Sequence, residues 1–204
     1  MQSVGIYGGT FDPIHFGHLN VAFELMEAHH LQQVWFCPAR INPFKMDQPE
    51  SLSIEQRMHM LKLALADIPQ FRVLDVESKR AGPSYTFDTL QEVLLLPENI
   101  AAERQFYLLL GEDSISSFFD WHRVAEIVDL VPLLVASRSG EVSMPLSANP
   151  KVYSALKKGM TKTRKMDICS TYVRERLQQD LYCGHLVPAK VIDYIYAHRL
   201  YSIP

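Results

Sequence analysis

Two histidines three residues apart, His15 and His18, are the side chains of this 204-residue chain best placed for chemistry. They follow the apolar stretch Val4-Gly5-Ile6-Tyr7 and the pair Gly8-Gly9, a pattern that predicts a buried strand, a tight turn and a helix. Residues i and i+3 share one face of a helix, so both imidazoles should project together near its N-terminus. Unpaired N–H groups and a partial positive charge make a helix N-terminus a site for anions. The spacing therefore predicts chemistry on a phosphate group.

The residues between the strand and the histidines strengthen this prediction. Gly8 and Gly9 let the backbone approach a nucleotide where a Cβ would clash. The Thr10 hydroxyl and nearby amides can hold phosphate oxygens, and Asp12-Pro13 breaks the strand, so we expect a structural role for Asp12. A glycine pair alone marks only a turn, and a single helical histidine is usually structural or solvated. Their coincidence at one strand–helix junction favours a functional site.

The full string Gly8-Gly9-Thr10-Phe11-Asp12-Pro13-Ile14-His15-Phe16-Gly17-His18 resembles the signature of the nucleotidyltransferase superfamily that carries a (T/H)xGH element. Within that superfamily the chain is similar, nearly end to end, to the bacterial nicotinate-mononucleotide adenylyltransferase family. The resemblance implies transfer of the adenylyl group of ATP to nicotinate mononucleotide, which gives deamido-NAD and pyrophosphate. It also implies Mg²⁺ carried by the ATP phosphates, and we assign no protein metal ligand.

Such a reaction needs alignment and charge stabilisation more than it needs a base. The second pKa of a phosphate monoester is near ~6, so the attacking phosphate is already an anion at neutral pH. We expect direct in-line attack without a covalent intermediate, assisted by hydrogen-bond donors and cations. The resemblance assigns catalytic roles to His15, His18, Lys45 and Arg174. Phe44 departs from the commoner Pro-His-Lys form of the family, which leaves the contribution of that histidine open.

Two later segments add to the predicted ATP side. Residues 168–174, Ile-Cys-Ser-Thr-Tyr-Val-Arg, are similar to the family's I-S-S-T-x-x-R, and we expect Ser170 at the N-cap of a helix. Cys169 stands where many relatives have serine, and a thiol is a poor donor, so a contact there would rely on the backbone. Arg138 resembles a family arginine that follows a buried strand. The predicted ATP-binding residues are Gly8, Gly9, Thr10, Phe11, His15, His18, Gly111, Asp113, Arg138, Ile168, Ser170, Thr171 and Arg174.

The mononucleotide side is marked by Gly82-Pro83-Ser84-Tyr85-Thr86, which is similar to the family's G-P-S-Y-T. A turn that presents amides and the Thr86 hydroxyl at a helix start suits a carboxylate, which nicotinate has and nicotinamide lacks. Trp121 matches the family's GxD…W pattern, and an indole can stack on a cationic pyridine ring. The predicted mononucleotide-binding residues are Lys45, Ser84, Tyr85, Thr86 and Trp121.

The elements that must position these residues alternate between strand and helix. Strands are predicted at residues 2–7, 34–37, 71–77, 106–110 and 133–136, with one more near 165–168. Helices are predicted from residue 19, where Leu19, Ala22, Phe23 and Met26 form an apolar stripe, and at 54–66, 86–96, 114–119, 123–129, 171–180 and 188–197. Residues 137–167 are read as mostly irregular.

This alternation predicts an α/β, Rossmann-like, doubly wound and mostly parallel sheet with helices on both faces. We expect one nucleotidyltransferase domain over residues 1–204, in which the helical portion from about 169 to 204 completes the ATP site. Ligands of such folds bind at the carboxyl ends of the strands, where the motifs fall.

Composition agrees with a cytoplasmic protein of this kind. The net charge of −3 gives no general reason to expect nucleic-acid binding. No apolar run approaches the ~20 residues that span a bilayer, so no membrane partner is expected. Three widely spaced cysteines show neither a CxxC pair nor a disulfide framework. Small-molecule substrates are the expected partners, and a homo-oligomer stays open.

Two other functions remain open at this stage. One is an adenylyl- or cytidylyltransferase for another phosphorylated acceptor, since the early motif does not separate acceptors. The other is a non-catalytic nucleotide sensor, which only the Phe44 and Cys169 departures favour. Retention of both histidines argues against a sensor.

Overall fold

A parallel sheet with the strand order β3-β2-β1-β4-β5-β6 forms the centre of the computed structural model, which describes residues 2–45, 52–137, 149–164 and 166–201. All the neighbouring strands that pair run parallel. The strands are β1 (Ser3–Gly9), β2 (Gln33–Pro38), β3 (Phe71–Val73), β4 (Gln105–Leu110), β5 (Leu133–Ser137) and β6 (Met160–Lys162). This confirms the predicted Rossmann-like α/β fold.

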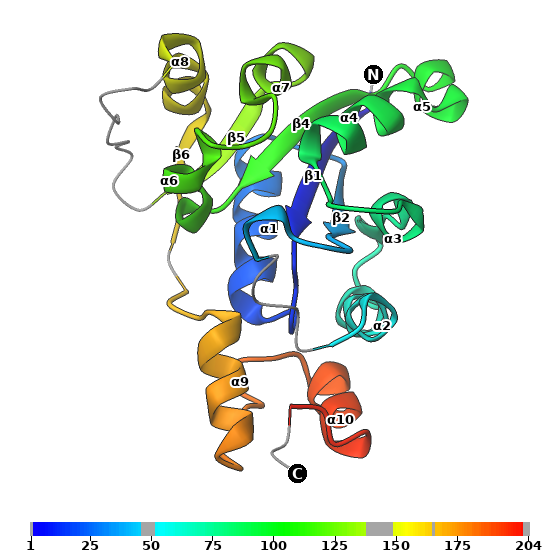
Figure 1. The fold of residues 1–204 in the computed structure, drawn as a ribbon, viewed down its shortest axis with the longest axis vertical. Coiled ribbons are helices and arrows are strands. Elements are labelled where there is room, and N and C mark those ends of the chain that lie inside the picture. Colours follow the sequence, from blue (N-terminus) through cyan, green and yellow to red (C-terminus); the bar gives the residue numbers. More distant parts are fainter. Residues whose placement is uncertain (1, 46–51, 138–148, 165, 202–204) are drawn as a thin grey trace.

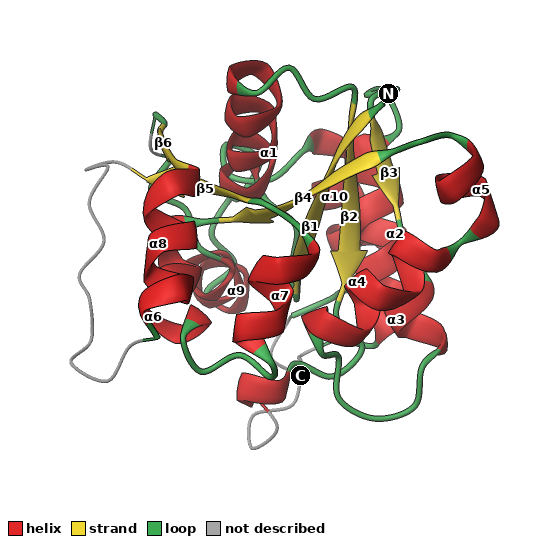
Figure 2. Cartoon of the chain, turned by 90° about the horizontal axis from the view of Figure 1, so that it is seen from above, coloured by secondary structure: helices red, strands yellow, loops and turns green. Residues whose placement is uncertain are grey.

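Helices cover both faces of this sheet (Figures 1 and 2). The helices are α1 (Phe16–Ala28), α2 (Ile54–Leu65), α3 (Val76–Lys79), α4 (Thr86–Leu95), α5 (Pro97–Ala101), α6 (Ile115–Phe118), α7 (Val124–Leu130), α8 (Pro150–Gly159), α9 (Ser170–Gln178) and α10 (Ala189–Ala197). None of the described helices is long and apolar enough to span a membrane.

Alternating side chains of the strands build two hydrophobic cores. Tyr7, Phe36 and Leu109 face one core, which α1, α2, α9 and α10 complete. Ile6 and Leu108 face the other core, together with side chains from α4, α6, α7 and α8. Successive residues of a strand point to opposite faces, so a strand buried on both sides reads as a continuous apolar run.

Several predicted elements differ from the structure. Gly8-Gly9, predicted as a tight turn, are the last two residues of β1 and pair with β2. The strand predicted over 71–77 ends at Val73, and α3 begins at Val76. The last strand lies at Met160–Lys162 rather than near 165–168. Within the segment read as irregular, α8 forms after Asn149, whose side chain accepts a hydrogen bond from the Lys151 amide (2.9 Å).

The sheet reverses its direction of progression at β1, which lies between β2 and β4. A crevice opens beyond the carboxyl ends of the strands at such a switch point. In Figure 1, α9 and α10 lie beyond the end toward which the β1 arrow points. The C-terminal helices thus lie close to the predicted motifs.

Gly159, at the junction of α8 and β6, packs closely against the neighbouring strand β5. A Cβ on buried Gly159 would lie 2.3 Å from the Leu133 carbonyl oxygen of β5. We expect Gly159→Ala to lower the free energy of unfolding by about 2 kcal/mol or more, because backbone must move to admit the methyl group. Urea unfolding monitored by circular dichroism measures this, with exposed Lys158→Ala as the neighbouring control. Equal unfolding midpoints for the two variants would contradict the close approach.

Candidate active site

A cavity of about 840 Å³ lies at the switch point and gathers nearly all the predicted site residues. It is lined by residues from β1, from the segments that follow β2 and β4, and from the start of α9. The predicted residues among them are Gly8, Gly9, Thr10, Phe11, His15, His18, Lys45, Ser84, Tyr85, Thr86, Gly111, Asp113, Trp121, Ile168, Ser170, Thr171 and Arg174. Arg138 lies outside the described residues.

The two histidines stack on each other at the start of α1. Their ring centroids are 3.7 Å apart with 27° between the planes. His15 is the N-cap residue and is buried, and its backbone N–H donates to Nδ1 of His18 (3.3 Å). Because Nδ1 of His18 accepts this bond, a neutral His18 carries its proton on Nε2. His18 is thereby fixed as an Nε2–H donor.

Burial keeps both imidazoles uncharged in the free protein. Desolvation lowers the pKa of His15 from 6.5 to about 4. Desolvation, with a smaller contribution from His15, lowers the pKa of His18 well below its usual value. The buried Nδ1 of His15 has no hydrogen-bond partner within the described part of the chain. The pair therefore offers neutral donors to the cavity.

Gly17, which lies between the histidines, has a steric role that the sequence did not reveal. A Cβ at this position would lie 2.9 Å from His15 Nδ1 and 3.1 Å from the Ile168 carbonyl oxygen. The missing side chain lets the His15 ring and the segment before α9 approach α1 together. Glycine is the one residue that fits between them without displacing either.

The turn formed by residues 10–13 is held by side chains from distant helices. Phe11 has a left-handed backbone (φ 52°), and the Asp12-Pro13 peptide bond is cis. Arg174 Nη1 donates to the Asp12 carbonyl (2.7 Å), and Ser170 Oγ donates to the Pro13 carbonyl (3.0 Å). Arg174 also donates to Thr171 Oγ1 (3.2 Å). The late helix α9 thus fixes the 10–13 turn while its first residues line the cavity.

Arg57 of α2 is a structural determinant that sequence reasoning missed. It is 1% exposed, and its Nη1 donates to the carbonyls of Thr10 and Ala39, both at 2.7 Å. Its position gave a signal, because Ile54, Arg57 and Leu61 lie at i, i+3 and i+7 on the buried face of α2. A charged residue on an apolar stripe indicates buried hydrogen-bond acceptors nearby.

The segment after β2 joins the predicted ATP side to the predicted mononucleotide side. Asn42 Nδ2 donates to Thr10 Oγ1 (3.0 Å), and the Arg40 amide donates to Ser84 Oγ (2.9 Å). The Ser84 amide in turn donates to the Ile41 carbonyl (2.9 Å). Lys45 follows on a short 3-10 turn and lines the cavity. Residues 39–42 therefore connect the two halves.

At the starts of α9 and α4, the N-cap residue lies one position before the motif residues Ser170 and Thr86. The N-cap of α9 is Cys169 rather than Ser170, and Cys169 Sγ accepts from the Tyr172 amide (3.5 Å). Ser170 is then free to donate to Pro13. Likewise α4 begins at Thr86, with Tyr85 as its N-cap residue. Residues at both helix starts line the cavity.

The mononucleotide side contains two lining residues that the sequence analysis did not assign. His122 packs against the Tyr85 ring with centroids 4.5 Å apart. Glu77 is buried and accepts from Thr89 Oγ1 (2.7 Å). The adjacent Trp121 packs on Phe118, with ring centroids 5.0 Å apart. The buried Nε1 of Trp121 has no acceptor among the described residues. No local motif marked His122 or Glu77, because their placement depends on the tertiary fold.

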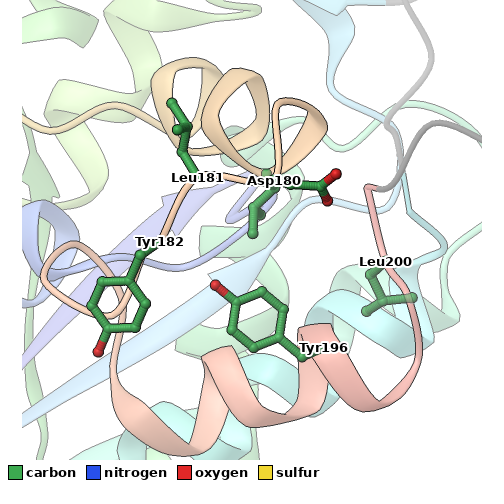
Figure 3. A pocket seen from close by; sticks show the side chains of 6 residues that line it. Asp180, Leu181, Tyr182, Tyr196 and Leu200 are labelled. Carbon is green, nitrogen blue, oxygen red and sulfur yellow. The ribbon is translucent and has the colours of Figure 1, made fainter.

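A smaller cavity of about 250 Å³ lies near α9 and α10 (Figure 3). Leu177, Asp180, Leu181, Tyr182, Tyr196 and Leu200 line it, and none of the predicted site residues does. Within the described ranges, no group of three or more His, Cys, Asp or Glu side chains is arranged to hold a metal ion. The large cavity is therefore the candidate active site.

The low pKa of His15 predicts an acid-dependent stability. Between pH 6.5 and about 4 the unfolded chain binds a proton at His15 that the folded protein does not. Stability present above pH 6.5 is therefore lost as the pH falls toward 4. From pH 7 to pH 5 we expect wild type to lose about 2 kcal/mol more unfolding free energy than His15→Asn. Urea unfolding at both pH values tests this, and parallel losses would contradict it.

Comparison with known proteins identifies the family. Residues 6–176 match the cytidylyltransferase-like family model. A probable nicotinate-nucleotide adenylyltransferase of Dehalococcoides mccartyi is 40% identical over 97% of this chain and 96% of its own length. One of Oceanobacillus iheyensis is 34% identical over 99% of this chain and 98% of its own length.

A solved structure shares the fold. The nicotinic acid mononucleotide adenylyltransferase of Plasmodium falciparum, solved with NaAD, has a TM-score of 0.75 at 21% identity, covering 98% of both chains. With the curated relatives matched over nearly their whole length, the chain belongs to the nicotinate-nucleotide adenylyltransferase family of cytidylyltransferase-like proteins.

Proposed function

We propose that this protein transfers the adenylyl group of ATP to nicotinate mononucleotide and releases deamido-NAD and pyrophosphate. The observation that carries the proposal is the set of residues that line the 840 Å³ cavity. Two stacked neutral histidines, Arg174 and the start of α9 line one part of it. The start of α4 and Trp121 line another. Family membership supports the same reaction.

In the proposed reaction an oxygen of the mononucleotide phosphate attacks the α-phosphorus of ATP. The new P–O bond forms as the bond between the α-phosphorus and the bridging oxygen breaks, and pyrophosphate leaves with the bond's electrons. His18 Nε2–H donates to an oxygen of the transferring group, and His15 lies beside it. Arg174 and Lys45 offset the charge that spreads over the phosphates. Catalysis comes from alignment of two anions.

Mg²⁺ enters this proposal as part of the substrate, bound to the ATP phosphates. Magnesium commonly binds through substrate phosphates and retains several waters. The ion would reduce repulsion between the two anionic substrates and stay with the departing pyrophosphate. The chain's own residues bind and orient the phosphates.

The acceptor is distinguished by its carboxylate in this proposal. Amides at the start of α4 and the Thr86 hydroxyl bind the nicotinate carboxylate, and Trp121 stacks on the cationic pyridine ring. We further infer one catalytic domain whose residues 169–204 complete the ATP site. The free thiols of Cys37, Cys169 and Cys183 suit the reducing cytoplasm that we infer as its compartment.

Removal of the His18 side chain should separate binding from turnover. We expect His18→Ala to lower kcat by about 100- to 1,000-fold, because one preorganised donor to the transferring group is lost. ATP should still bind appreciably. Pyrophosphate release measures turnover, and calorimetry measures ATP binding, with His29→Ala at the far end of α1 as the control. Near wild-type kcat in His18→Ala would reject the assigned role.

Acceptor selectivity tests the carboxylate site. We expect kcat/KM for nicotinate mononucleotide to exceed that for nicotinamide mononucleotide roughly 100-fold, since the amide lacks the charged acceptor. Thr86→Val keeps the shape of the side chain and should narrow this ratio. Equal rates with both substrates would reject the carboxylate site. A wild type that binds ATP but turns over no mononucleotide would instead favour a nucleotide sensor.

A further inference from the structure

A buried hydrogen bond joins the end of the chain to the turn beneath the ATP side of the cavity. The Tyr201 hydroxyl donates to Oδ1 of Asp12 at 2.6 Å, across 189 residues of sequence. Both side chains are buried, with 4% of Asp12 and 9% of Tyr201 exposed. Asp12 does not line the cavity, so this contact lies behind the residues that face ATP.

We propose that Tyr201 is a positioning residue for ATP, acting through Asp12 on Arg174 and on the 10–13 turn. This inference rests on the function proposed above. Asp12 is the common partner, because its carboxylate accepts from Tyr201 and its backbone carbonyl accepts from Arg174 Nη1 (2.7 Å). A shift of Asp12 would therefore move the anchor of a guanidinium that lines the cavity.

The Tyr201–Asp12 hydrogen bond places a proton donor on a buried acidic side chain. A buried carboxylate next to a site for phosphates is unfavourable unless its oxygens are hydrogen-bonded. Burial and the charge of Asp12 raise the pKa of Tyr201 strongly, so the phenol keeps its proton and remains a donor. Tyr201 thus donates a hydrogen bond to a buried carboxylate that lies next to the proposed phosphate site.

The backbone near the C-terminus is shaped to deliver this hydroxyl. After α10 the Leu200 amide donates to the Ile195 carbonyl (3.0 Å), and Arg199 and Tyr201 both have left-handed backbones, with φ of 49° and 65°. Leu200 packs into the core that contains α9 and α10. Non-glycine residues adopt such conformations only where surrounding contacts hold them. Those contacts here include the Tyr201–Asp12 hydrogen bond.

The effect should be specific for ATP, since other contacts hold the mononucleotide side. Ser84 is fixed by the Arg40 amide and the Ile41 carbonyl, and α4 carries Tyr85 and Thr86 at its start. None of these contacts involves Asp12 or Tyr201. Loss of the Tyr201 hydroxyl should therefore weaken ATP binding and leave the acceptor site intact.

The test is Tyr201→Phe, which keeps the ring in the core and removes only the hydroxyl. We expect KM and Kd for ATP to rise about tenfold, as for loss of one hydrogen bond to a charged group. KM for nicotinate mononucleotide should stay within about twofold of wild type. The control is Tyr196→Phe, on a half-exposed tyrosine of α10 that faces the smaller cavity (Figure 3), and it should match wild type.

A double mutant tests the route through Arg174. If Tyr201 acts through Asp12 on Arg174, Tyr201→Phe should weaken ATP binding much less in an Arg174→Gln background than in wild type. Additive effects would contradict this route. In Asp12→Asn the amide oxygen still accepts from Tyr201, so we expect ATP binding to weaken by a smaller factor than in Tyr201→Phe. This variant provides the test if Tyr201→Phe does not fold.

The outcomes separate this proposal from the proposed function. Unchanged ATP Kd in Tyr201→Phe, or equal increases of KM for both substrates, would overturn the positioning role. A wild type that binds ATP without transferring its adenylyl group would overturn the proposed function, while ATP Kd would still test Tyr201. A wild type that does not bind ATP would overturn both.

Discussion

The site depends on the direction in which the carbonyl groups of the 10–13 turn point. A phosphate repels carbonyl oxygens, so if the 10–13 turn binds phosphates as proposed, its carbonyls must point elsewhere. In this protein the carbonyls of Thr10, Asp12 and Pro13 accept hydrogen bonds from Arg57, Arg174 and Ser170. Two helices far apart in sequence, α2 and α9, supply these donors. The fold brings both helices to the turn that follows β1.

Neutral histidines suit the proposed binding of a highly charged nucleotide at this site. Two imidazolium ions 3.7 Å apart would repel each other, and burial removes that problem by lowering both pKa values. The neutral rings still donate hydrogen bonds. Bound phosphates favour the charged form of a nearby imidazole. If one histidine takes up a proton when the nucleotide binds, its hydrogen bonds to the phosphates would become stronger. Burial thus lowers the pKa values of the two histidines, whereas a bound anion raises them.

The sequence predicts the local part of this arrangement and misses the long-range part. The strands β1, β2, β4 and β5 follow from apolar runs of neighbouring residues, and the structure has all four near their predicted positions. The helix α8 was missed because its surface is polar and basic. Its buried positions Val152, Leu156 and Gly159 nevertheless follow helical spacing. The bonds made by Arg57 and Tyr201 span 47 and 189 residues, and no local pattern encodes such distances.

Residues 39–42 connect the two parts of the cavity to which we assign the two substrates. Arg57 and Asn42 fix this segment to Thr10, and Arg40 and Ile41 fix it to Ser84. The distance between the 10–13 turn and the start of α4 is therefore set by short hydrogen bonds through a single connecting segment. Adenylyl transfer requires the attacking oxygen and the leaving oxygen to lie in line with phosphorus. In the proposed reaction, the hydrogen bonds of residues 39–42 help to bring the two halves of the site together, and no catalytic base is needed because the acceptor phosphate is already ionised.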